Sequence, residues 1–226
     1  MYKKKSLGQH FLRTHSYLNA VADAAHIKEG ETVVEIGPGD GALTEVLLER
    51  GAKVVALEKD ARLIDFLKEK FTGKKFEVVE GDALEFDFAD GHHPRDGAHL
   101  QYKVVGNIPY YITGALFKKF LSGPLQPSTL VFLVQKEVAE RIARSKKESI
   151  LSLSVKAYGD VKYVKTVPRG AFSPAPAVDS AIVAVSNISR KNFTSSAHEK
   201  KFFELIKNLS MFNQTDIFLH RLISFS

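Results

Sequence analysis

The run Asn107-Ile108-Pro109-Tyr110 combines groups that could hold a flat amine. Asn107 offers a neutral carbonyl acceptor, and Pro109 has no amide proton to compete for the backbone carbonyl of Ile108. Tyr110 adds an aromatic face. Hydrogen bonds from an aromatic amine to both acceptors would pull its nitrogen toward tetrahedral geometry, which suits methyl transfer by positioning and electrostatics, without a metal or an obligatory strong base. The alternative is a Pro-Tyr turn that only caps a strand.

A second motif indicates a nucleotide-cofactor site. The β-branched run Val33–Ile36 breaks into Gly37-Pro38-Gly39-Asp40-Gly41 and then continues with helical spacing, which predicts strand, tight turn and helix. The spacing differs from G-x-G-x-x-G, the proline lacks an amide donor, and the aspartate adds a negative charge, so the turn suits pyrophosphate poorly. It favours a cationic ligand without phosphate, such as S-adenosylmethionine. An NAD-type or purely structural turn is the alternative.

Carboxylates stand at or near the ends of three predicted strands. Glu35 lies in the first strand, Glu58 ends the second, and Asp82 follows the third. The carboxyl ends of parallel strands form the ligand crevice of an open sheet. We therefore expect Glu58 to bind a ribose diol, and we interpret Glu58 and Asp82 as ligand-facing acids, with solvated turn acids as the alternative.

These motifs need an α/β fold to position them, and the hydrophobic pattern predicts one. Strands and helices alternate along the chain, and a closing strand pair follows them. The predicted helices are 16–26, 61–71, 136–144, one beginning near 150, and 198–209. Besides the strand before the glycines, the predicted strands are 53–58, 76–80, 102–106, 129–134, 162–167 and 181–185.

Composition limits the class of protein and its partners. The chain has 226 residues, 44% of them apolar, which suits one main domain. A net charge of +6 fits a polyanionic partner or ordinary mild basicity, and Lys3, Lys4, Lys5 and Arg13 form a basic N-terminal arm. The absence of cysteine excludes disulfides, thiolate metal sites and a cysteine nucleophile. No signal peptide or membrane span is recognisable, so we expect a cytoplasmic protein.

Three histidines in the polar segment 90–99 raise the possibility of a metal site. The segment has no hydrophobic residues that could fix the imidazoles around a metal ion. We therefore interpret it as a surface loop and expect no metal.

Five motifs in order resemble the ribosomal RNA adenine dimethylases, the family that includes the KsgA and Erm enzymes. They are Ser6–Leu12, Val34–Thr44, Gly106–Thr113, Val134–Arg141 and Phe172–Ser180. The match runs from about Lys5 to Val185 and looks closest to the bacterial KsgA branch. It implies a Rossmann-like α/β methyltransferase with a mostly parallel seven-stranded sheet and S-adenosylmethionine as cofactor. It also implies dimethylation of two adjacent adenosines near the 3′ end of small-subunit ribosomal RNA, coupled to ribosome assembly, with the pre-30S particle as partner. We expect a monomer.

The resemblance also implies roles for individual residues. Cofactor contacts fall on His10, Leu12, Gly37, Glu58, Asp82 and Asn107. The catalytic set is Asn107, Pro109, Tyr110 and Phe172. Phe172 precedes the rigid segment Ser173–Pro176, which could hold its ring over a pocket, so that a flipped adenosine would stack between Tyr110 and Phe172. The alternative for Phe172 is a core aromatic.

The chain departs from the family in two places. Glu148-Ser149 replaces a usual Tyr-Gly before the helix near 150. Relatives continue into a small helical domain, whereas here a methyltransferase domain, 1–186, with its basic arm is followed by a short, atypical helical remnant, 187–226. We hypothesise a truncated or frame-altered C-terminus, whose apolar residues between 217 and 225 must pack or pair with another chain.

Three other functions remain open. An Erm-type enzyme would act on large-subunit RNA, but those relatives tend to carry Val-Asn-Ser where this chain has Val178-Asp179-Ser180. A non-catalytic RNA-binding assembly factor would be favoured if the missing helices were needed to dock RNA. An NAD-dependent reductase is the weakest option, because nothing supplies a hydride-transfer site.

Overall fold

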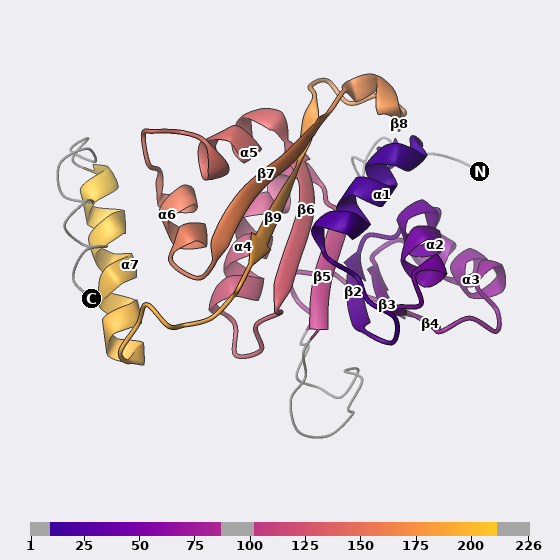
Figure 1. Ribbon diagram of the computed structural model, residues 1–226, viewed down its shortest axis with the longest axis horizontal. Helices are drawn as coiled ribbons and strands as arrows, with labels where there is room; N and C mark the ends of the chain where they lie inside the picture. The colour runs from indigo at the N-terminus through magenta and orange to yellow at the C-terminus, as the bar shows by residue number, and fades with distance from the viewer. Residues whose placement is uncertain (1–9, 87–101, 212–226) are drawn as a thin grey trace.

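The structure is a computed structural model that describes residues 10–86 and 102–211, and its centre is a seven-stranded sheet (Figure 1). The strand order is β4-β3-β2-β5-β6-β9-β7. The strands are β2 (Thr32–Ile36), β3 (Lys53–Glu58), β4 (Phe76–Glu80), β5 (Tyr102–Asn107), β6 (Thr129–Gln135), β7 (Asp160–Val167) and β9 (Ser180–Ser186). Neighbours from β4 to β6 are parallel, whereas β9 is antiparallel to both β6 and β7. The predicted mostly parallel sheet is confirmed.

Burial explains why the strands could be recognised. In β5, β6 and β9 almost every residue is buried, as expected for central strands covered on both faces. The edge strand β7 instead alternates between more and less exposed residues over most of its length. It begins at Asp160, two residues before the predicted start.

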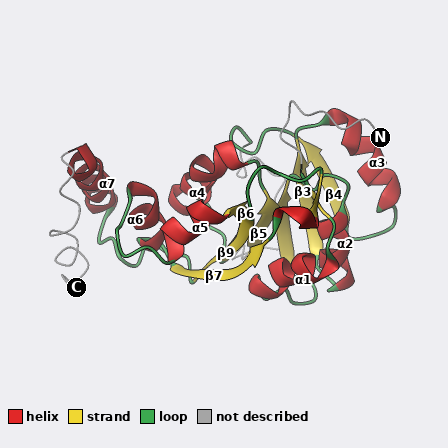
Figure 2. Ribbon diagram, turned by 90° about the horizontal axis from the view of Figure 1, so that it is seen from above, coloured by secondary structure: helices red, strands yellow, loops and turns green. Residues whose placement is uncertain are grey.

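Helices cover both faces of the sheet (Figure 2). One face carries α1 (His15–Ala24), α2 (Ala42–Glu49) and α3 (Ala61–Lys70), and the other carries α4 (Thr113–Ser122), α5 (Lys136–Ala143) and α6 (Ile150–Lys156). Successive β2 residues show the division, since Val33 packs with α1 and α2 while Val34 belongs to the core under α4. Helix α1 ends earlier than predicted because His26 takes a positive φ of 50°.

Two short strands form a second, two-stranded sheet. β1 (Phe11–Leu12) pairs antiparallel with β8 (Phe172–Ser173), with Leu12 opposite Phe172. The amide of Arg13 extends the pairing by donating to the carbonyl of Ala171 at 2.9 Å. We call this β1–β8 pair the strap. The strap thus attaches the end of the N-terminal arm to the domain.

Helix α7 (Ser196–Met211) lies beyond α6 at one end of the molecule (Figure 1). Ile206 of α7 packs against Leu153 of α6, and Phe202 and Phe203 flank that contact. Arg190, in the preceding segment, donates to the carbonyls of Ser122 and Gly123 and pairs with Glu199. The predicted helix 198–209 is therefore confirmed, while residues 217–225 lie outside the described part of the chain.

The loop before α6 is fixed by hydrogen bonds to the first turn of that helix. Ser149 caps the helix by accepting from the amide of Ser152, whose hydroxyl in turn accepts from the amide of Ser149. Ser149, one of the two residues that depart from the family, thus forms a capping box with Ser152, and Glu148 pairs with Lys156.

Candidate active site

A cavity of about 410 Å³ opens at the carboxyl ends of β2, β3, β4 and β5. Its wall comes from the strap, the glycine turn after β2, the ends of β3 and β4, and the turn after β5, which contains the 3₁₀ helix η2 (Tyr110–Ile112). This volume lies within the range of small-molecule sites, roughly 300 to 1,000 Å³. The cavity stands where the strand-end acids and the Asn107 motif were predicted to meet.

The glycine turn has the predicted backbone shape. Gly37, Gly39 and Gly41 have φ values of +66°, +60° and +81°, which residues with a side chain rarely adopt. A Cβ on Gly37 would have no atom within 4 Å, so the backbone there is open to a ligand. A Cβ on Gly39 would lie 2.8 Å from the Phe11 ring, because the strap crosses the turn at that point. Arg13 also forms an ion pair with Asp40 of the turn.

Glu58 is held beside this turn by backbone amides. Its Oε2 accepts from the amide of Gly39 at 3.2 Å and its Oε1 from the amide of Asp60 at 2.9 Å. The side chain lines the cavity although the residue is only 5% exposed. Burial raises the pKa of Glu58, and the amide hydrogen bonds partly oppose that rise. Each carboxylate oxygen has a further lone pair, so Glu58 can accept hydrogen bonds from a ribose diol as predicted.

Asp82 lies at the same rim and is fixed by two donors. Its Oδ2 pairs with the Lys59 ammonium at 2.7 Å, and its Oδ1 accepts from the amide of Leu84 at 2.9 Å. The hydrogen bond from Lys59 is the main reason that the pKa of Asp82 is lowered. Asp82 therefore stays ionised at neutral pH and faces the cavity as an oriented acceptor.

Glu35 is a third acid in the cavity wall, and it is almost completely buried, at 1% exposure. The Thr44 hydroxyl donates to its Oε2 at 2.6 Å. Burial raises the pKa of Glu35 from 4.5 to about 8, and the nearby Glu58 and Asp40 add to the rise while Thr44 opposes it. Glu35 is thus largely protonated at neutral pH, which limits the negative charge of the cavity wall.

The raised pKa of Glu35 predicts a pH-dependent stability. Between its unfolded value of 4.5 and its folded value of about 8, the folded chain holds a proton that the unfolded chain releases, so stability falls as pH rises. We expect the melting temperature of the ligand-free protein to fall between about pH 5 and about pH 8. In Glu35→Gln the fall should be clearly smaller. Equal slopes in both proteins would show that Glu35 does not cause the effect.

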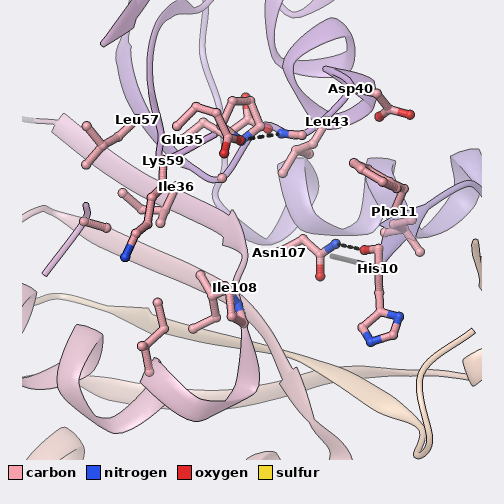
Figure 3. Close-up of a pocket in the computed structure, with 18 of the residues that line it drawn as sticks. His10, Phe11, Glu35, Ile36, Asp40, Leu43, Leu57, Lys59, Asn107 and Ile108 are labelled. Atoms are coloured by element: carbon pink, nitrogen blue, oxygen red, sulfur yellow. Dashed lines mark hydrogen bonds between the residues drawn. The ribbon is translucent and has the colours of Figure 1, made fainter. Parts of the chain in front are cut away.

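The side-chain amide of Asn107 has a defined direction. Its Nδ2 donates to the backbone carbonyl of His10 at 2.7 Å, as the dashed line in Figure 3 shows. Only the nitrogen can make this bond, because a carbonyl accepts and does not donate. The Oδ1 of Asn107 is therefore left as the end of the carboxamide that can accept a hydrogen bond from a ligand in the cavity.

The turn after Asn107 presents an aromatic ring in a fixed position. Pro109 precedes η2, and the Tyr110 hydroxyl forms a hydrogen bond with the Ser180 hydroxyl at 2.7 Å. Partial burial raises the pKa of Tyr110, so the phenol stays neutral. The Tyr110 ring lies nearly parallel to the His10 imidazole, with centroids 6.4 Å apart and planes 19° from parallel.

The structure brings together all but one of the predicted site residues. His10, Leu12, Gly37, Glu58, Asp82, Asn107, Pro109 and Tyr110 all line the cavity. Phe172 is 6% exposed, packs in an apolar cluster with Leu12 and Leu18, and is not part of the cavity wall. Its predicted role as a stacking face stays a prediction.

Sequence reasoning did not assign several residues of the wall to the site, and three of them are polar or aromatic residues of interest. Glu35 was recognised as a strand-end acid but not proposed for the site, and Lys59 and Tyr111 were not singled out. Lys59 directly follows the ribose-binding candidate Glu58, which is the signal that could have found it. Tyr111 is 77% exposed at the mouth of the cavity, an unusual position for a large aromatic ring.

The hydrogen-bond acceptors and apolar side chains of the cavity wall fit S-adenosylmethionine. Gly37 leaves the backbone open, Glu58 and Asp82 supply carboxylates, and Leu57, Ile108 and other apolar side chains line the space between them. A ligand with a ribose, an adenine and a cationic methionine end meets acceptors and apolar surface here. Within residues 10–86 and 102–211, no three His, Cys, Asp or Glu side chains gather as a metal site would require.

Comparison with known proteins agrees with this assignment. The family model described as "Ribosomal RNA adenine dimethylase" matches residues 1–222. The chain belongs to this family. A relative from Dehalococcoides mccartyi (strain CBDB1), named ribosomal RNA small subunit methyltransferase A, is 44% identical over 208 residues, or 90% of this chain and 69% of the relative. The dimethylase described here therefore spans about two thirds of that relative's length.

Solved structures support the fold of the dimethylase. A crystal structure of a dimethyladenosine transferase from Plasmodium falciparum has a TM-score of 0.75 and 32% identity, covering 88% of this chain and 70% of that one. The 23S rRNA methyltransferase ErmE has a TM-score of 0.74 and 29% identity, covering 88% and 79%. The protein is thus a Rossmann-like methyltransferase, and its cofactor is S-adenosylmethionine.

The described part of this dimethylase contains no helix with the length and apolar character needed to cross a membrane. The three histidines of segment 90–99 lie outside the described residues, so the surface-loop interpretation of that segment stays a prediction.

Proposed function

We propose that this dimethylase methylates the exocyclic amine of two adjacent adenosines near the 3′ end of small-subunit ribosomal RNA. Two features support the choice of the small subunit. The relative from Dehalococcoides mccartyi carries the small subunit in its name, and its 44% identity exceeds the 29% of ErmE, which is named for 23S rRNA. The five motifs also look closest to the KsgA branch.

The observation that carries the proposal is the fixed carboxamide of Asn107. Because Nδ2 is bound to the His10 carbonyl, Oδ1 can accept from an adenine amine without first rotating or giving up another partner. S-adenosylmethionine, when bound, supplies an electrophilic methyl group. The chain's own part is to hold the amine, to stack the base on Tyr110, and to keep both under the strap.

The proposed partner is a precursor of the small ribosomal subunit. We propose that the protein binds it as a monomer in the cytoplasm. The formal charge of +6 suits a ribosomal RNA partner. All parts of the described site come from one chain, so no second copy is needed to complete it. We also infer that the methyltransferase domain is 1–186, since β9, the last strand of the sheet along the chain, ends at Ser186, and that the α7 region is an appendage.

A transfer assay tests the proposal. Purified protein and labelled S-adenosylmethionine are added to under-methylated small subunits, to large subunits and to naked small-subunit RNA, and primer extension locates any blocked base. We expect label in the small subunit, with blocks at two adjacent adenosines. Label in the large subunit would support the Erm-type reaction. Cofactor binding with no transfer to any substrate would favour the non-catalytic assembly factor instead.

A further inference from the structure

The edge strand β7 carries two lysines on one face because it contains a β-bulge. Lys162 is paired with Ala184 of β9. Lys165 is paired with Ile182, two positions away on β9, because Val164 has no partner there. Side chains alternate between the two faces of a strand, so a separation of three residues would normally place the lysines on opposite faces. The extra residue of the bulge places them on the same face.

This face of β7 is the one beside α1. Ala184 and Ile182 belong to the apolar cluster that contains Leu18 of α1, and cross-strand partners point to the same side of a sheet. The Lys165 ammonium accordingly lies 5.1 Å from the centre of the Tyr17 ring of α1. Both lysines are exposed. The edge of the sheet beside α1 thus carries two cations about 7 Å apart along the strand.

A third cation lies on the opposite face of β7. Tyr163 is paired with Val183, which belongs to the other large core cluster, and its hydroxyl bonds the Thr166 hydroxyl at 2.7 Å. The guanidinium of Arg144, just after α5, lies 3.6 Å from the centre of the Tyr163 ring. Arg144 is exposed as well. We call these three cations, Lys162, Lys165 and Arg144, the basic edge.

The charge of the basic edge is not balanced by neighbouring acids. Among the residues that the structure describes, no carboxylate forms an ion pair with any of its three cations, whereas Lys103 and Lys156 both pair with glutamates. Lys165 and Arg144 are packed on tyrosine rings, which orient a cation without neutralising it. The positive charge therefore stays available to an anionic partner.

The basic edge begins beside the cavity wall. β7 ends at Val167, which is paired with Ser180, and the Ser180 hydroxyl holds the Tyr110 ring in the wall. β7 is also the last strand of the described sheet, with β9 on one side only (Figure 1). A polymer that reaches the cavity at Tyr110 can therefore continue along the outer side of β7. The alternative role of lysines on an edge strand is to prevent pairing with another chain.

We propose that the basic edge binds the phosphate backbone of the ribosomal RNA strand beside the target nucleotide. This inference rests on the proposed function and adds a docking surface to it. A nucleic acid strand carries one negative charge for about every 3.4 Å of helix axis, so two lysines about 7 Å apart can contact phosphates of the same strand together. Contacts to phosphate fix the position of the RNA and read no sequence.

The salt dependence of RNA binding tests this surface. Lys162→Gln/Lys165→Gln removes two charges but keeps polar side chains, and Lys162→Arg/Lys165→Arg keeps the charges. The control, Lys74→Gln/Lys75→Gln, removes two exposed charges just before β4, at the end of the sheet away from the cavity. Each protein is titrated onto under-methylated small subunits at several salt concentrations. The slope of log affinity against log salt concentration reports the number of phosphate contacts.

We expect the glutamine variant of the basic edge to reduce the slope by about 1.4 to 1.8 and the affinity by about 10- to 30-fold at about 0.15 M salt, since each contact contributes about 0.7 to 0.9 to the slope. The arginine variant and the control should match the wild type. In transfer assays KM for small subunits should rise while kcat stays unchanged. Affinity for S-adenosylmethionine should also be unchanged, because the basic edge is not part of the cavity wall.

A wild-type slope in the glutamine variant would overturn the inference, and self-association of that variant would then show that the lysines only protect the edge. An equal loss in the Lys74→Gln/Lys75→Gln control would overturn it too, because the effect would be one of net charge. A labelling experiment needs no variant: small subunits should protect Lys162 and Lys165 of the wild type from acetylation, measured by mass spectrometry, and equal labelling with and without subunits would contradict the proposal. Binding with the expected slopes but without methyl transfer would refute the proposed function and leave the docking surface supported.

Discussion

Replacing Asn107 by alanine is expected to lower methyl transfer by about two to three orders of magnitude, the usual loss when one preorganised hydrogen-bonding group is removed from an active site. The acceptor that faces the target amine disappears, and the carbonyl of His10 loses its partner. Affinity for S-adenosylmethionine should change little, because Glu58, Asp82 and the glycine turn remain. Single-turnover transfer to small subunits and calorimetry with the cofactor measure the two effects separately.

Two further variants control this prediction. Asn107→Asp keeps the shape but places a carboxylate oxygen against the His10 carbonyl, so two acceptors would face each other and transfer should again be lost. Asn192→Ala removes another asparagine that donates to a backbone carbonyl, that of Ala157, outside the cavity, and transfer should be retained. Full activity in either Asn107 variant would contradict the role of this side chain.

Replacing Glu58 by alanine is expected to weaken the binding of S-adenosylmethionine by about two to four orders of magnitude, because hydrogen bonds to a charged acceptor contribute about 1.5 to 3 kcal/mol each and a ribose diol makes two. The substitution also leaves the amides of Gly39 and Asp60 without their carboxylate acceptor. Calorimetry gives the dissociation constant directly. Normal affinity in this variant would show that the ribose assignment is wrong.

The same residue predicts how cofactor affinity depends on pH. Burial raises the pKa of Glu58, so its carboxylate is protonated at a higher pH than an ordinary glutamate. Cofactor affinity should therefore fall as pH is lowered through that raised pKa. Glu58→Gln should have lower affinity throughout and lack this component of the pH dependence. Glu49→Ala, at an exposed position at the end of α2, should bind like the wild type.

Much of the fold could be predicted because its signals are local. The strands predicted at 53–58 and 76–80 have those bounds in the structure, since apolar β-branched runs between turns identify buried strands. The glycine turn and the acids at the strand ends also depend on neighbouring residues. The cavity therefore lies where the sequence predicted it.

The contacts that finish the site are long-range and could not be predicted in the same way. The strands of the strap have two residues each, too few for any periodic pattern, and they pair across about 160 positions of sequence. The direction of the Asn107 carboxamide depends on that pairing, because its partner is the carbonyl of His10, next to Phe11 of β1. The burial of Phe172 depends on it too, because Leu12 of β1 is one of its neighbours.

The strap and the late insertion of β9 have a consequence for synthesis of the protein. β6 cannot gain its second neighbour until β9 has been made, and β1 cannot pair until Phe172 and Ser173 have been made. A nascent chain therefore lacks both of these pairings until the segment 172–186 has been made. The complete seven-stranded sheet is thus available to the dimethylase only after most of its chain has been synthesised.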